Sequence, residues 1–145
     1  FTFDDDKAEN KKGDKEPTIL VFDKHDPLRF RFDDGTVSLI IRAGLKREGE
    51  DDIPTQIVTV PLTFNITKEN ILVKRGDVKV APAKRPDSLA KQVVRAGVMR
   101  KKIESAIADR KDDKSVTIER PDREDIVVTV ATIKALNGWL TISVR

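Results

Sequence analysis

Hydrophobic and polar residues alternate over Leu28–Ile41, on both sides of the pair Asp34-Gly35. An Asp-Gly pair between alternating segments is a strong hairpin signal, and a type I′ turn requires φ > 0 at both central residues. Counting outward from the turn gives the cross-strand pairs Phe32–Val37, Phe30–Leu39 and Leu28–Ile41. Because these side chains share one face, a slip of one residue would expose them all. The pattern predicts a β-hairpin with one apolar face.

Other stretches with a period of two extend this hairpin into a meander of about five strands. Pro61 falls within one of them, and because proline cannot donate to a ladder, we expect an edge position or a bulge there. A break is expected at Gly76-Asp77, and a charged loop over Arg42–Pro54. The strands are Thr18–Phe22, the two hairpin strands, Ile57–Ile66 and Ile71–Val80.

The period changes from 2 to 3.6 after Pro86, which predicts a helix from about residue 88 to about residue 110. Asp87 or Ser88 is the expected N-cap. Arg100 falls in line with the apolar stripe and would have to reach solvent or find a partner. The stripe comprises Leu89, Val93, Ala96, Ile103 and Ile107, widened by Ala90, Val94 and Val98.

A short strand at Val116–Ile118 and a second hairpin around Asn137-Gly138 close the chain. The expected pairs are Leu136–Trp139, Ala135–Leu140, Ile133–Ile142 and Ala131–Val144. Together these elements predict an α+β fold: a curved antiparallel β-meander with one long amphipathic helix packed on its apolar face and a closing C-terminal β-hairpin. Residues 1–17 contain few apolar side chains and are expected to be a flexible tail or linker, followed by a single domain over residues 18–145.

Composition limits the possible functions. Charged residues make up 37% of the 145 residues, yet the net charge is only +3, so nucleic acid is not an expected partner. There is no Cys, which excludes disulfides, thiolate zinc sites and thiol catalysis. No apolar run has the length of a membrane span. These features do not fix the compartment, and an extracytoplasmic or envelope-associated location is slightly favoured.

Several strings resemble an uncharacterised β-rich domain of large planctomycete bacterial proteins. They are Leu28–Val37 (LRFRFDDGTV), Arg75–Val80 (RGDVKV) and Asn137–Leu140 (NGWL), where such proteins often carry Asp-Gly-Trp-Leu. The resemblance covers residues 17–145, and the chain departs from the pattern by a shorter, more basic segment at 84–114. It implies a C-terminal domain that follows an N-terminal partner domain, and it implies no activity.

Catalytic and metal-binding patterns are weak. His25 is the only histidine; with Asp26 beside it, it could serve as a base or ligand, but a surface role is the simpler interpretation. Asp33-Asp34 and Glu50–Asp52 offer carboxylates for Ca²⁺ without the alternating spacing of an EF-hand loop. No nucleophile elbow or phosphate loop occurs. We therefore expect no enzyme activity, no cofactor and no resident metal.

The strongest charge signal is the segment 84–114, which carries ten basic and five acidic residues, a net +5. A basic helix face could meet an acidic partner, phosphate groups or anionic lipid, or could simply be solvated. Its residues are Lys91, Arg95, Lys101, Lys102 and Arg110.

Two functions follow as hypotheses. The first is a non-catalytic structural or interaction domain, with an N-terminal domain of the same parent protein or another protein as its partner. The second is a binding module that holds a lipid or another hydrophobic ligand between sheet and helix. The oligomeric state cannot be derived from the sequence.

Overall fold

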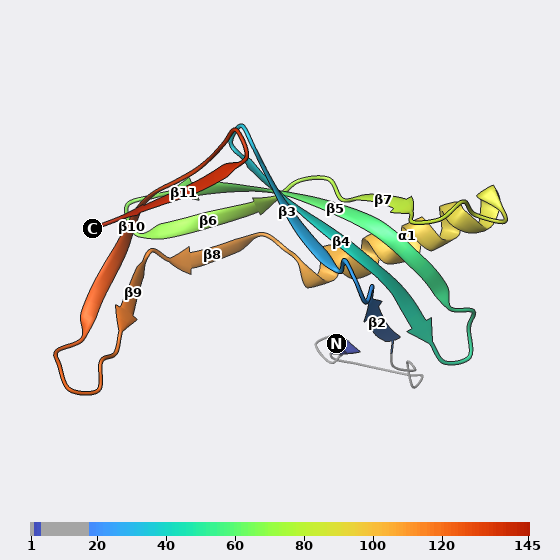
Figure 1. The fold of residues 1–145 in the computed structure, drawn as a ribbon, viewed down its shortest axis with the longest axis horizontal. Helices are drawn as coiled ribbons and strands as arrows, with labels where there is room; N and C mark the ends of the chain where they lie inside the picture. The colour runs from blue at the N-terminus through green and yellow to red at the C-terminus, as the bar shows by residue number, and fades with distance from the viewer. Residues whose placement is uncertain (1, 4–17) are drawn as a thin grey trace. The chain divides into compact units, whose positions relative to one another are not determined.

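The computed structural model describes residues 2–3 and 18–145, which form antiparallel strands and one helix (Figure 1). This confirms the α+β class. The predicted tail lies outside the described residues, except that Thr2–Phe3 pair with Thr18 and Ile19. The elements are β1 (Thr2–Phe3), β2 (Thr18–Phe22), β3 (Leu28–Asp33), β4 (Thr36–Arg47), β5 (Ile53–Ile66), β6 (Asn70–Arg75), β7 (Lys79–Pro82), α1 (Leu89–Ala106), β8 (Arg110–Asp113), β9 (Ser115–Ile118), β10 (Ile126–Leu136) and β11 (Trp139–Val144).

The chain divides into two compact units. Strands β3, β4 and β5 contribute residues to both units. Whether residues 18–145 behave as a single domain stays a prediction. Unit 1 contains the described residues up to Arg29 together with Leu39–Thr59 and Val78–Ile107, and unit 2 contains Phe30–Ser38, Val60–Asp77 and Ala108–Arg145.

In unit 1, β2 pairs with β4, and Leu20 lies opposite Leu45. Both side chains are buried, as are Ala43 and Val58. The predicted loop over Arg42–Pro54 is present only at Glu48–Asp52, and its predicted bounds were wrong, because β4 continues to Arg47 and β5 already begins at Ile53. Strand β4 continues past Arg42 because Ala43 and Leu45 bury apolar side chains at alternate positions, and these residues pair with β2.

Gly44 allows an unusually close approach between neighbouring strands of unit 1. A Cβ atom at this position would lie 2.5 Å from the carbonyl oxygen of Ile53 and 3.3 Å from the carbonyl carbon of Pro54. Both atoms belong to the backbone and cannot rotate away. Only glycine therefore fits at this point of β4.

The helix of unit 1 is rotated relative to the sequence prediction. Its buried residues are Gln92, Met99 and Ile103, whereas Leu89 and Val93 are 79% and 73% exposed. The expected stripe was wrong at its N-terminal half, where Val94 is also exposed. The buried row begins with a polar residue because the amide of Gln92 bonds to that of Gln56 on β5. Hydrophobicity alone could not reveal this choice of face.

The ends of α1 follow local chemistry. Ser88, one of the two expected N-caps, caps the helix. Its Oγ accepts a hydrogen bond from the backbone nitrogen of Lys91 at 3.3 Å. The helix ends at Ala106 rather than near residue 110, because Arg110–Asp113 form β8 and pair with β6. Arg100 has the partner that its position required, since its Nε donates to the carbonyl oxygen of Val78 at 3.2 Å.

In unit 2, the expected break at Gly76-Asp77 separates β6 from β7. Pro61 lies where β5 changes partners, between Gln56–Thr59, which pair with β7, and Leu62–Ile66, which pair with β6. The nitrogen of Gly76 donates to the carbonyl oxygen of Pro61 at 2.8 Å. The missing N–H of Pro61 thus falls at an interruption of the ladder, which is the placement that proline favours.

The three-stranded sheet β11-β10-β9 of unit 2 contains the predicted C-terminal hairpin. Asn137 and Gly138 have φ values of 50° and 83°, consistent with a type I′ turn. The register agrees with the prediction from Leu136–Trp139 to Ile133–Ile142. A bulge then places Val130, not Ala131, opposite Val144, so the outermost predicted pair was wrong.

The two hairpin turns of unit 2 bond to each other. The nitrogen of Gly35 donates to the carbonyl oxygen of Ala135, and the nitrogen of Gly138 donates to that of Phe32, both at 2.8 Å. At the first turn only Gly35 has positive φ, so the type I′ prediction for Asp34-Gly35 was wrong. This hydrogen bond to a distant strand supplies a constraint that the local sequence does not contain.

Two glycine substitutions test the packing of unit 1. Gly44→Ala should lower the free energy of unfolding by at least about 2 kcal/mol, because the added methyl meets backbone atoms. Gly97→Ala is the matched control: a Cβ there meets nothing within 4 Å, and alanine in a helix interior should raise stability by up to about 1 kcal/mol. Chemical denaturation measures both. Equal effects of the two substitutions would contradict the close approach at Gly44.

Candidate functional site

The predicted basic face is only partly assembled on the helix. Lys91, Arg95, Lys101 and Lys102 lie on α1 in unit 1, but Arg110 lies on β8 in unit 2. Arg110 was assigned to the face because the helix was expected to reach residue 110, whereas it ends at Ala106. Binding of an anionic partner to the remaining residues stays a prediction.

Neighbouring acids already engage two of these cations. Arg95 Nη1 lies 3.4 Å from Asp87 Oδ1, and Arg110 Nη2 lies 2.9 Å from Asp112 Oδ1. A hydrogen bond from its own backbone, followed by the contact with Arg95, holds the pKa of Asp87 below 3.8. Near the start of α1, the charge of Arg95 is therefore partly balanced by its ion pair with Asp87.

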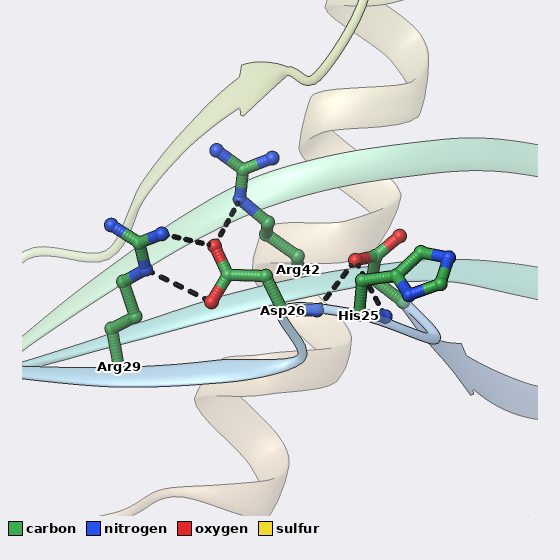
Figure 2. A network of polar contacts seen from close by, with 5 residues as sticks. His25, Asp26, Arg29 and Arg42 are labelled. Atoms are coloured by element: carbon green, nitrogen blue, oxygen red, sulfur yellow. Dashed lines mark hydrogen bonds and ion pairs between the residues drawn. The ribbon is translucent and has the colours of Figure 1, made fainter.

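A polar network surrounds the bend between β2 and β3 in unit 1 (Figure 2). Arg29 contacts both carboxylate oxygens of Asp26, at 2.9 Å from Nε and 2.7 Å from Nη2. Arg42 Nε approaches the same carboxylate at 3.6 Å. The hydrogen bond from Arg29, followed by the charges of both arginines, lowers the pKa of Asp26 below 3.8. The bidentate geometry fixes the bend before β3.

His25 enters this network only through its backbone. Its nitrogen donates to Asp23 Oδ2 at 3.2 Å, as the nitrogen of Asp26 does at 2.8 Å (Figure 2). Asp23 thereby forms a turn of the kind in which a side chain bonds the backbone two or three residues later. The arrangement accounts structurally for Asp23 and Asp26, which bond the backbone of the bend and the side chain of Arg29.

The two candidate carboxylate sites are used in local contacts. Asp33 accepts a hydrogen bond from Arg31 Nε at 2.9 Å, and Glu50 forms an ion pair with Arg47 at 2.5 Å. Asp52 Oδ1 accepts from the backbone nitrogen of Arg47 at 3.3 Å. Among residues 2–3 and 18–145, no three side chains of His, Asp or Glu come together as a metal-ligating group.

A polar cavity beside the start of α1 was not predicted from the sequence. It has a volume of about 560 Å³ and lies entirely within unit 1. Gln56 and Gln92 are in its wall, and its rim carries Arg42, Lys84, Arg85 and Arg95. One signal could have been found: Gln56 is in phase with Val58 and Val60 on the apolar face of β5. A polar residue in such a position needs a buried partner.

Large apolar side chains are exposed in both units. On β11 all six residues are exposed, and Trp139 is 76% accessible to solvent. The hairpin face that the sequence predicts as apolar, formed by Leu140, Ile142 and Val144, is among them. In unit 1 the exposed set includes Ile19, Val21 and Leu28, as well as Leu89, Val93 and Val94. Where such side chains form a large contiguous patch, they mark an interaction site.

Comparisons with known proteins add no relative. No protein-family model, no curated protein and no solved structure matches the chain. Over the described ranges, no helix combines the length and the hydropathy needed to span a membrane.

The Asp26 network makes a pH-dependent prediction. Because the pKa of Asp26 is lower in the folded state, its contribution to stability is present above the unfolded pKa and is lost as the pH falls through the folded pKa. Asp26→Asn should therefore lower the free energy of unfolding at neutral pH. The difference from the original protein should shrink below about pH 4, where Asp26 becomes protonated. Unfolding in denaturant across this pH range measures it. A difference in the free energy of unfolding that stays constant with pH would contradict the lowered pKa of Asp26. Arg29→Gln should raise the pKa of Asp26, because it removes the hydrogen bond and charge of Arg29.

Proposed function

We propose that this chain is a non-catalytic interaction domain that completes its packing against another protein, either a neighbouring domain of the same parent protein or a separate chain. The observation that supports this most strongly is β11, a strand with every residue exposed and four large apolar side chains. Residues of one strand alternate between the two faces of a sheet, so Trp139 lies on one face and Leu140, Ile142 and Val144 lie on the other. Both faces of the strand therefore present apolar surface.

Trp139 is the expected centre of the contact. Tryptophan is enriched among the residues that contribute most to protein–protein binding, because it buries a large area and retains an N–H donor. Leu136, its cross-strand neighbour, is also exposed and extends the same face. The predicted basic residues of α1 would then contribute to orientation and association rate rather than to the apolar contact.

Site-specific photo-crosslinking tests this proposal. A photoreactive phenylalanine analogue at position 139, expressed in the native host, should yield one adduct of defined mass, whereas the same analogue at exposed Glu119 should not. Leu136→Glu, on the same face as Trp139, should reduce the adduct several-fold with a stability change within about 0.5 kcal/mol, because Leu136 is already exposed. Equal yields at positions 139 and 119, or no adduct at 139, would contradict the proposal.

The alternative is a binding module for a hydrophobic ligand. A cavity of about 300 Å³ in unit 2 supports it, with a wall formed mainly by Val37, Phe64, Ile133, Ala135 and Leu136. This cavity lies beside β10, whereas the space beneath α1 is filled by the fully buried Met99 and Ile103. Native mass spectrometry with organic extraction decides this alternative: a hydrophobic adduct would support it, and a mass equal to that of the bare chain would count against it.

A further inference from the structure

The buried amides of Gln56 and Gln92 form a hydrogen-bonded chain with a fixed direction. Gln56 is 0% exposed, and its Nε2 donates to the carbonyl oxygen of Pro54 at 2.9 Å. Gln92 is 9% exposed, and its Nε2 donates to Oε1 of Gln56 at 2.6 Å. A carbonyl oxygen can only accept, so reversing either amide would place two acceptors together. The chain therefore ends in an acceptor, Oε1 of Gln92.

This terminal acceptor has no hydrogen-bond partner within the described part of the chain, although it is buried. A buried acceptor without a donor destabilises the fold, and native proteins nearly always satisfy such groups. Both glutamines are in the wall of the 560 Å³ cavity of unit 1. A ligand seated there can supply the missing donor through an O–H or N–H group.

The rim of the cavity favours a negative charge. Four of its residues are cationic and two, Asp23 and Asp87, are acidic. Asp23 already accepts two backbone hydrogen bonds, and Asp87 is paired with Arg95. Lys84 and Arg85 are exposed at the rim, just before α1 begins. The first turn of α1 contains no acidic residue, so its positive dipole end adds to the attraction for an anion.

We propose that this cavity binds a small hydroxylated anion, either a sugar acid or a sugar phosphate. A ligand hydroxyl donates to Oε1 of Gln92, and the carboxylate or phosphate lies near Lys84 and Arg85. The volume is within the range of small-molecule sites, roughly 300–1,000 Å³. The site lies on unit 1 and is independent of the protein-docking surface on β11, so either proposal can fail without the other.

The chain contains only two glutamines, which makes the test direct. Their side-chain amide signals can be assigned by NMR from single substitutions and followed during titration with D-glucuronate and with glucose 6-phosphate. At least one of these probes should shift the Gln92 amide saturably. D-glucose, which lacks the charge, and acetate, which lacks the hydroxyls, should bind at least about tenfold more weakly. The two anions also distinguish a carboxylate from a phosphate site.

Variants separate binding from folding. Replacing both amides in Q56M/Q92M removes donor and acceptor together, so the variant should remain folded and lose at least about tenfold in affinity. Should that variant not fold, the charge reversal K84E/R85E at exposed positions should produce the same loss, while Lys46→Ala, at an exposed position of β4 outside the cavity, should bind as the original protein does.

Three results would overturn the proposal. The first is that neither anion shifts the Gln92 amide at millimolar concentration. The second is that glucose or acetate binds as well as the anions, and the third is that K84E/R85E retains full affinity. A crystal structure in glucuronate with only water bonded to Oε1 of Gln92 would likewise show that the cavity merely hydrates a structural amide.

Discussion

The hydrogen bond between Gln92 and Gln56 determines which side of the helix unit 1 buries. Once Gln92 faces the sheet, Met99 and Ile103 follow it inward, because residues seven and eleven positions later return to the same side of an α-helix. Leu89 and Val93 then face outward. In this arrangement Oε1 of Gln92 has no donor among the described residues, and Gln92 lines the polar cavity.

Elements governed by local chemistry could be predicted from the sequence. The Asn137-Gly138 turn, the Ser88 cap and the break at Gly76 each depend on conformational preferences of residues within a few positions. The rotation of α1 could not be predicted, because it depends on a pair of amides 36 residues apart. The turn type at Asp34-Gly35 was predicted wrongly for the same reason, because the nitrogen of Gly35 bonds to Ala135, which is distant in the sequence. The cavity was missed because a buried glutamine looks, in sequence, like a solvated one.

The two units offer different kinds of surface. Unit 2 exposes a hairpin with apolar side chains on both of its faces, which suits a protein partner of extended contact area. Unit 1 combines exposed aliphatic residues on α1 with a polar, basic cavity, which suits a small charged ligand. The carboxylates that might have held a metal are used instead in ion pairs and turns, such as the Asp26–Arg29 pair.

The orientation of α1 is the central claim, and thiol labelling tests it most directly. The chain has no cysteine, so Leu89→Cys, Val93→Cys and Met99→Cys each introduce a single thiol. Under native conditions the thiols at positions 89 and 93 should react with a maleimide at rates close to those of the unfolded chain. The thiol at position 99 should react only when the protein opens. Protection at 89 and 93 together with fast labelling at 99 would show that the predicted apolar stripe is buried after all, and would contradict this account.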